Sequence, residues 1–188
     1  MEYPVALNSM KPLITFNEFD IFPLSKDTAA KFAVKINTAL DQIPLVDKHT
    51  ADQLLAETKG DRILYAKWVH SLIALTSNMD FAGIIIGYER IHEDNDQYPL
   101  NSIYLNDFAV SAGHQKKGLG KYLVKTWLDY NQTVGFKELD GKLRFSVQTN
   151  SAEWNKHVQV LYESCGFKKT ATKQYDNRID YVYVLDVE

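Results

Sequence analysis

One short segment combines glycine, lysine and glutamine in a spacing that suits the binding of a phosphate group. Residues 115–120 read Gln-Lys-Lys-Gly-Leu-Gly, between a strand-like run that ends at Val110 and a run with helical periodicity. Glycine lets a backbone turn tightly and approach a ligand closely. The N–H groups of the first helical turn and the helix dipole attract an anion. The segment indicates an anion site; a glycine-containing turn with solvated lysines is the alternative.

The lysines beside these glycines indicate which anion would bind. Lys116, Lys117 and Lys121 add positive charge for a pyrophosphate or a 3′-phosphate. The segment is not a Walker A loop, because no Gly-Lys-Ser/Thr ends it, and it lacks the three-glycine Rossmann spacing. A nucleotide-phosphate-binding protein is therefore disfavoured, since no magnesium-binding Ser or Thr follows the loop.

A single acidic side chain stands in the apolar run before this loop. Asp107 is the only acid in residues 103–110. A carboxylate within an apolar strand is costly unless it is paired or solvated by a cleft. It could accept a proton from an ammonium group, directly or through water. It could equally bond to a backbone amide at a strand irregularity, so both roles stay open.

The loop and a second segment together resemble a known family. The strand of residues 103–110 followed by Gln115-x-x-Gly118-x-Gly120 resembles motif A of the GNAT acetyltransferase superfamily, in which a valine precedes the Gln/Arg position by five residues, as Val110 does. Asn155, followed seven residues later by Tyr162 and then by Gly166-Phe167, looks like motif B of that family. Motif A covers about residues 103–132 and motif B about 142–167.

The resemblance implies a role for each matching residue. Backbone groups of the strand end would pair with the pantetheine arm of acetyl-CoA, the loop N–H groups would cradle its pyrophosphate, and Asn155 would orient the pantetheine or its bound water. Tyr162 would protonate the leaving thiolate, since a phenol is neutral at pH 7 and close to a thiol in acidity; a core tyrosine on an amphipathic helix is the alternative. The residues implied for acetyl-CoA are Phe108, Ala109, Val110, Gln115, Lys116, Lys117, Gly118, Leu119, Gly120, Lys121 and Asn155.

A finer resemblance concerns the acceptor of the acetyl group. Residues 104–108 and 152–155 look like stretches of the spermidine/spermine N-acetyltransferases, which carry Glu-Asp-Phe on the strand and Glu-Trp-Asn before the helix. Here Asn106 replaces the glutamate and only Asp107 remains. A polyamine, an amino sugar, an amino acid, an aminoglycoside and a protein lysine or N-terminus all stay open as acceptors.

Composition limits the other classes of function. The 188 residues carry a net charge of −3, so a nucleic-acid partner is not expected, and no apolar run approaches the length of a membrane span. One cysteine, Cys165, can form neither an intramolecular disulfide nor a metal site, and the five histidines lack metal-ligand spacing. We expect no metal, a cytoplasmic or nuclear location, and a single acetyltransferase domain over residues 1–188.

Hydrophobic periodicity predicts the elements that must position these residues. The pattern gives a mixed α/β domain of the α+β type: a GNAT-type mixed central sheet flanked by about four helices. Strands are predicted at residues 13–23, 71–76, 81–91, 102–110 and 143–148, with a closing hairpin of 168–175 and 180–187. Helices are predicted at residues 28–42 (capped by Ser25 or Asp27 and ended by Pro44), from 50 to a stop at Gly60, at 118–132 with an apolar face of Leu119, Leu123, Val124 and Trp127, and at 155–164 with a stop at Gly166. A surface loop is predicted at 92–97.

These observations lead to one hypothesis and one main alternative. The leading hypothesis is an acetyl-CoA-dependent N-acetyltransferase in which a primary amine, from a small molecule or a protein, attacks the thioester directly in a ternary complex. Much of the acceleration would come from positioning, with backbone N–H groups such as that of Val110 polarising the carbonyl. The alternative is a non-catalytic acyl-CoA-binding sensor or scaffold on the same fold. Dimers are common in the family, so a homodimer is a further expectation.

Overall fold

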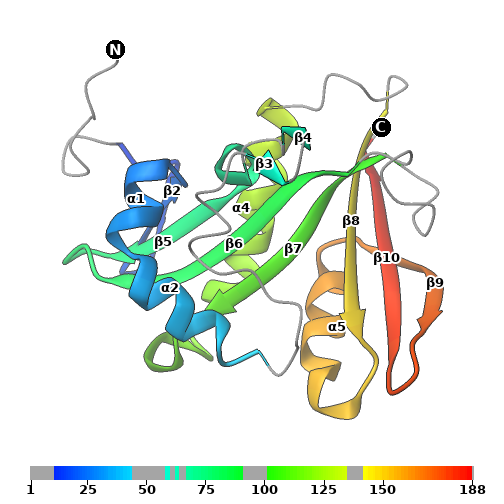
Figure 1. Ribbon diagram of the computed structural model, residues 1–188. Helices are drawn as coiled ribbons and strands as arrows, with labels where there is room; N and C mark the ends of the chain where they lie inside the picture. The colour runs from blue at the N-terminus through cyan, green and yellow to red at the C-terminus, as the bar shows by residue number, and fades with distance from the viewer. Residues whose placement is uncertain are drawn as a thin grey trace. The chain divides into compact units, whose positions relative to one another are not determined.

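The computed structural model describes residues 11–43, 58–59, 62–63, 67–90, 101–134 and 142–187, with only the backbone at 58–59, 62–63 and 67–68. The α-helices in these ranges are α1 (Lys26–Lys31), α2 (Ala33–Leu40), α4 (Leu119–Val134) and α5 (Lys156–Ser164), and the 3-10 helices are η2 (Lys67–His70), η4 (Ala112–His114) and η5 (Glu153–Asn155). The strands are β1 (Ile14–Phe16), β2 (Phe19–Pro23), β3 (Thr58–Lys59), β4 (Arg62–Ile63), β5 (Leu72–Thr76), β6 (Phe81–Arg90), β7 (Ser102–Val110), β8 (Leu143–Asn150), β9 (Lys168–Gln174) and β10 (Ile179–Val187) (Figure 1).

Eight of these strands form one mixed sheet. Their order is β1-β2-β5-β6-β7-β8-β10-β9, and β3 and β4 pair separately. β7 and β8 are parallel, whereas the pairs β1–β2, β2–β5, β5–β6, β8–β10 and β9–β10 are antiparallel. With four α-helices in the described residues, the predicted mixed sheet of an α+β protein is confirmed.

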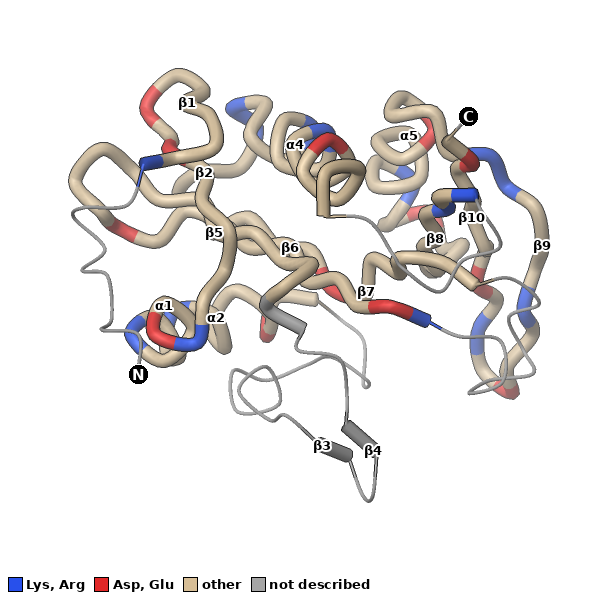
Figure 2. The backbone as a smooth tube through the Cα atoms, turned by 90° about the horizontal axis from the view of Figure 1, so that it is seen from above, with Lys and Arg blue, Asp and Glu red and all other residues tan. Residues whose placement is uncertain are grey.

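Contacts between residues divide the chain into two compact units. The first comprises Met1–Tyr88 and Asp107–Trp127, and the second comprises Glu89–Asn106 and Leu128–Glu188. β6, β7 and α4 each run from one unit into the other. Within the first unit, α1 and α2 lie on one face of the strands and α4 lies on the other (Figure 2). The cluster beneath α1 and α2 is apolar and buried: Phe22, Leu24, Ala29, Phe32, Ile36, Ala39, Leu40, Ile73, Leu75, Phe81, Ile84, Ile86 and Ala109.

The helix α4 is fixed to the first unit by a buried tryptophan. Its predicted apolar residues Leu119, Leu123, Val124 and Trp127 are all buried. The indole N–H of Trp127 donates to the carbonyl oxygen of His70 at 2.6 Å. A Cβ placed on Gly87 would lie 2.7 Å from that oxygen and 2.8 Å from the indole. The close approach of α4 to β6 therefore requires a glycine at this position.

In the second unit, α5 covers the face of β8 and β10 that carries Tyr183. The rings of Tyr162 and Tyr183 lie 6.4 Å apart, and the Tyr183 hydroxyl donates to Glu163 at 3.2 Å. Burial and the Glu163 carboxylate raise the pKa of Tyr183 to about 12. Gly166, predicted as the stop of this helix, has φ +96°, the left-handed conformation typical of a helix end.

Two predicted elements at the start of the chain are wrong in detail. Residues 13–23 form a hairpin of β1 and β2 and not one strand, because Asn17 takes a left-handed φ of 53° between them. The helix predicted over 28–42 is two helices, since Phe32 leaves helical geometry between them with ψ 13°. Ser25 is confirmed as the cap of α1, where it forms a capping box with Thr28.

The later elements agree with the prediction to within two residues at each end. The strands that became β5, β6, β7 and β8, the helices α4 and α5, and the hairpin of β9 and β10 are all confirmed. Pro44, residues 50–57 and Gly60 of the second predicted helix, and the loop at 92–97 lie outside the described residues. Residues 58–59 of that predicted helix are wrong, because they pair with β4 as the strand β3.

Candidate functional site

The segment between β7 and α4 has the backbone of a tight anion-binding loop. After η4 the chain is extended at Gln115, and then Lys116 (φ 61°) and Gly118 (φ 82°) take left-handed conformations. The side-chain amide of Gln115 donates to the carbonyl oxygen of Val110 at 3.0 Å and to Gln42 at 3.3 Å. This bond gives a physical reason for the five-residue spacing between the valine and the glutamine.

Gly118 and Gly120 fix the start of α4 in different ways. Gly118 supplies the left-handed turn, and its carbonyl oxygen accepts the N–H of Tyr122 at 3.2 Å. The N–H groups of residues 119–121 therefore precede the first N–H group that has an intrahelical acceptor, and they are the donors that a phosphate can use. A Cβ on Gly120 would meet the ring of Phe108 at 3.1 Å, so the helix start and the strand end pack without space for a side chain. The loop geometry fits a pyrophosphate.

The three predicted lysines are not equivalent. All are exposed, but the Lys117 ammonium forms an ion pair of 2.8 Å with Glu18 in the β1–β2 turn. The hydrogen bond and positive charge of Lys117 lower the pKa of Glu18, with a smaller contribution from His114. Glu18 lies 99 residues from Lys117 in sequence, and no local pattern marks it as a partner of the loop.

Side chains at the end of β7 alternate between the two faces of the sheet. Phe108 faces α4, as its contact with Gly120 shows, whereas Ala109 belongs to the cluster beneath α1 and α2. Residues two apart on a strand share a face, so Asp107, 7 % exposed, lies on the face of Ala109. Its carboxylate and the phosphate loop are therefore on opposite faces of the strand.

The β7–β8 ladder is short. In the second unit the parallel register runs from Ile103↔Phe145 to Leu105↔Val147, while β7 continues as a strand to Val110. Within the first unit this last part of β7 stays attached to β6, where Ser111 donates its N–H to Ala82 at 2.9 Å.

Asn155 is held firmly at the start of α5 in the second unit. Its amide donates to the Thr149 hydroxyl at 2.6 Å and to the Asn150 carbonyl oxygen at 2.8 Å, and its side chain is buried. These two bonds use both amide protons, so the carboxamide oxygen is the atom left to accept a hydrogen bond from a ligand.

Tyr162 lies on the buried face of α5. It is 3 % exposed, and its ring packs against Phe167 (5.8 Å between centroids) and Tyr183. The N–H of Phe167 donates to the carbonyl oxygen of Tyr162, which ties the helix end to the following strand. These contacts fix the orientation of the Tyr162 ring. A fixed ring is compatible with a packing role and with the delivery of one proton.

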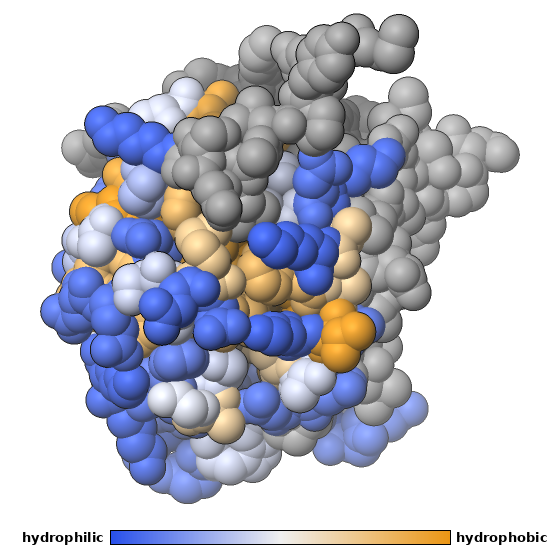
Figure 3. Space-filling model, turned by 90° about the vertical axis from the view of Figure 1, so that its left-hand side faces the viewer, coloured by the Kyte–Doolittle hydropathy of each residue, from blue (hydrophilic) through white to orange (hydrophobic). Residues whose placement is uncertain are grey.

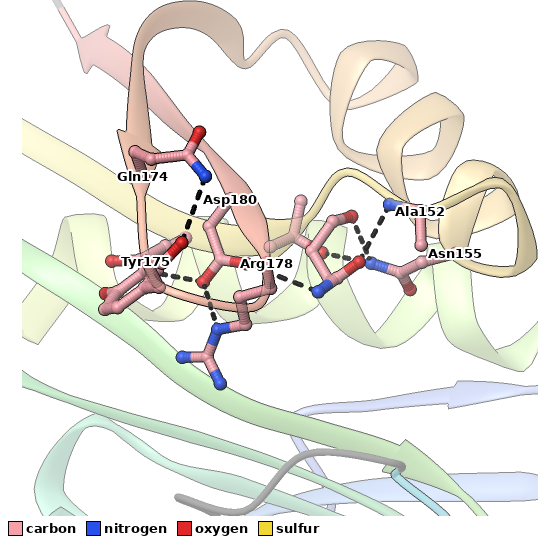
Figure 4. A network of polar contacts seen from close by, with 9 residues as sticks. Ala152, Asn155, Gln174, Tyr175, Arg178 and Asp180 are labelled. Carbon is pink, nitrogen blue, oxygen red and sulfur yellow. Dashed lines mark hydrogen bonds and ion pairs between the residues drawn. The ribbon is translucent and has the colours of Figure 1, made fainter.

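A polar network that the sequence analysis did not predict lies beside Asn155 (Figure 4). The buried carboxylate of Asp180 accepts from Gln148 at 2.6 Å and from Asn150 at 3.4 Å, and pairs with Arg178 at 3.3 Å. Gln148 also donates to the hydroxyl of Tyr175 at 2.8 Å. The side chain of Asn150 donates to Asp180, and its carbonyl oxygen accepts from Asn155. The network therefore links the β9–β10 hairpin to the start of α5. The sequence signal that could have indicated this network is Asp180, a charged residue inside the apolar run of 179–187.

Hydrogen bonding also changes the acidity of Tyr175. Burial opposes ionisation of this phenol, but hydrogen bonds from Gln148 and Lys173, the Lys173 charge and a bond from Arg178 outweigh it, so its pKa is lowered. The Arg178 guanidinium lies 4.5 Å from the ring centroid. The donors and the positive charge around Tyr175 therefore make this phenol more acidic than a free one.

The predicted site residues thus fall into two groups. The loop residues and Asp107 belong to the first unit, and Asn155 and Tyr162 belong to the second. Within the described ranges, no helix is long and apolar enough to cross a membrane. The same ranges hold no group of three or more His, Cys, Asp or Glu side chains placed to bind a metal ion.

Comparisons with known proteins agree with this geometry. A family model described as an acetyltransferase (GNAT) domain matches residues 68–169, more than half of the 188-residue chain. Comparison with curated proteins gives no match. Among solved structures, the chain resembles the NatC complex bound to Gag peptide and CoA (TM-score 0.66, 20 % identity, covering 92 % of this chain and 100 % of that one).

Two further structures share the fold. One is Arabidopsis thaliana Naa50 in complex with a bisubstrate analogue, CoA-Ac-MVNAL (TM-score 0.59, 18 % identity, 90 % and 99 % covered). The other is spermidine N-acetyltransferase from Vibrio cholerae with CoA and spermine (TM-score 0.59, 15 % identity, 90 % and 95 % covered). Together with the family model, the loop and the mixed sheet, these likenesses lead to one conclusion: the chain belongs to the GNAT acetyltransferase family.

Proposed function

We propose that the protein is an acetyl-CoA-dependent N-acetyltransferase that moves the acetyl group to a primary amine in a ternary complex. The observation that carries this proposal is the loop of residues 115–120, whose left-handed turn and close-packed glycines leave the first N–H groups of α4 for a pyrophosphate. We also propose that residues 1–188 act as one acetyltransferase domain.

The binding of acetyl-CoA in this proposal uses backbone groups and one carboxamide. Backbone groups of Phe108, Ala109 and Val110 pair with the pantetheine arm, and the short β7–β8 ladder supports this because β7 extends beyond it. The Asn155 carboxamide oxygen accepts a hydrogen bond from the pantetheine or its water. Lys116 and Lys121 add positive charge at the loop.

The chemical step requires one group that takes a proton from the amine and another that gives a proton to the thiolate. The neutral amine attacks the thioester carbon while the carbon–sulfur bond breaks, and the N–H of Val110 stabilises the carbonyl oxygen. Tyr162 gives its proton to the departing thiolate. Asp107 attracts the ammonium and takes the proton that the amine loses, directly or through water.

The test is a screen of amines for CoA release, combined with calorimetry of CoA binding. The panel contains polyamines, amino sugars, amino acids, aminoglycosides, and peptides with a free N-terminus or lysine. Peptides and polyamines are included because one similar structure is bound to Gag peptide and another is in complex with spermine. We expect CoA to bind and at least one amine to release it. Binding without release by any amine would favour the alternative of a non-catalytic sensor, and no binding would overturn both.

A further inference from the structure

The β1–β2 hairpin contacts the phosphate loop at its turn. Asn17, in the left-handed region, directs the turn, and the next residue, Glu18, pairs with Lys117 at 2.8 Å. The carbonyl oxygen of Glu18 accepts the N–H of Ser77 at 3.0 Å, which anchors the turn to the β5–β6 connection. Glu18 is therefore held beside the loop by its backbone as well as its side chain.

Aromatic side chains of the same hairpin pack on the loop and the start of α4. The ring of Phe16 stacks on Tyr122, with centroids 4.1 Å apart and planes at 18°, and lies 3.5 Å from where a Cβ of Gly118 would be. Phe19 meets His114 edge to face at 5.3 Å. Figure 3 views the side of the molecule that carries this hairpin, where hydrophilic residues surround a hydrophobic area.

The Lys117 ammonium is directed to the hairpin. It lies 2.8 Å from the Glu18 carboxylate and 5.8 Å from the centroid of the Phe19 ring. An anion that binds the loop must compete with Glu18 for this lysine, and the carboxylate also repels it. Both side chains are about half exposed, 46 % and 52 %, so solvent screens the pair and the competition is modest.

We propose that Glu18 is a positioning residue that withdraws Lys117 from the bound phosphates and thereby lowers the affinity for acetyl-CoA. This inference rests on the proposed function, because it requires a phosphate at the loop. Release of Lys117 from Glu18 adds one cation to the site without any change in the loop backbone.

The test is a set of four variants measured by calorimetry with CoA. Glu18→Gln keeps the shape and removes the charge, and we expect CoA to bind about two- to five-fold more tightly. Asp20→Asn is the matched control: it removes the same charge from the same hairpin, but its carboxylate accepts from Thr15 at 2.6 Å and not from a loop lysine. The control should bind CoA as the wild type does.

Lys117→Met shows whether the effect passes through the lysine. In that background Glu18→Gln should change CoA affinity by less than about twofold, because only the screened repulsion remains. With Lys117 present, Glu18→Gln should make CoA affinity fall more steeply with added salt, while kcat at saturating acetyl-CoA stays unchanged. A purely structural effect of Glu18→Gln would leave the salt dependence of CoA affinity unchanged. It would also not change KM without changing kcat.

The outcomes separate this inference from the proposed function. If wild-type protein binds CoA and Glu18→Gln binds it equally or more weakly, Glu18 does not withdraw Lys117 and the inference is wrong. If wild-type protein binds no CoA at all, the proposed function fails, and this inference fails with it.

Discussion

The phosphate loop of the first unit and the Asn155–Tyr162 region of the second are held in different ways. Side chains tie the loop through exposed contacts, such as the Lys117–Glu18 pair and the Gln115–Gln42 bond. Asn155 and Tyr162 are 6 % and 3 % exposed and belong to buried hydrogen-bonded and aromatic neighbourhoods. Substitutions at the loop surface should therefore tune ligand affinity, whereas substitutions in the second region should also affect stability.

The largest effect is expected where the loop has no space. Gly120→Asp puts a Cβ 3.1 Å from Phe108 and a carboxylate at the anion site, and should weaken CoA binding about 10²-fold or more. Gly118→Glu should act similarly, since its φ of +82° disfavours any side chain. Gly113→Asp is the control, because nothing lies within 4 Å of its Cβ position. Calorimetry on folded protein that found wild-type affinity in Gly120→Asp would refute the loop assignment.

Next in size is the loss of the proposed proton donor. Tyr162→Phe keeps the ring packing and should lower kcat about 10²-fold or more with little change in acetyl-CoA binding. Tyr181→Phe, on β10 beneath Lys169, is the control and should retain kcat. An unchanged kcat across pH in Tyr162→Phe would assign this tyrosine to packing.

A smaller effect is expected on the amine side. Asp107→Asn should lower kcat/KM for the amine about tenfold, which corresponds to about 1.4 kcal/mol of lost attraction for the ammonium. Acetyl-CoA affinity should stay nearly intact, because Asp107 lies on the other face of β7 from Phe108. Higher pH should restore part of the rate, since more amine arrives neutral. Normal amine kinetics at pH 7 in a folded variant would make Asp107 a structural residue.

The last expected effect concerns stability and tests whether burial decides how much an ion pair contributes within the second unit. Asp180→Asn leaves the donors of Gln148 and Arg178 poorly satisfied in a buried place and should cost about 1–3 kcal/mol of unfolding free energy. Asp186→Asn, on the same strand, breaks the ion pair between Asp186 and Arg144. Because the Asp186 side chain is 58 % exposed, this change should cost less than about 1 kcal/mol of unfolding free energy. Urea unfolding measures both. Equal losses would show that burial does not distinguish the two pairs.

Local patterns predicted most of the fold and the backbone of the site. The apolar spacing of α4, the Gly166 stop and the Ser25 cap depend on residues close in sequence, so they could be predicted directly. The turn at Asn17 was missed, although the adjacent polar residues Asn17 and Glu18 shift the apolar alternation by one position there; neither residue is a glycine or a proline, which would have marked the turn. Contacts such as those of Glu18 with Lys117 and of Asp180 with Gln148 join distant segments, and only the folded chain reveals them.

The packing of Trp127 over Gly87 has a consequence for how sequences of this kind can diverge. A relative that carries a side chain at the position of Gly87 has no space for an indole at 127, because a methyl group there would overlap both the ring and the His70 carbonyl oxygen. The two positions should therefore change together, glycine with tryptophan or a larger residue with a smaller one. Gly87→Ala alone should be poorly tolerated, and Gly87→Ala combined with Trp127→Leu should be tolerated better than the sum of the two single changes.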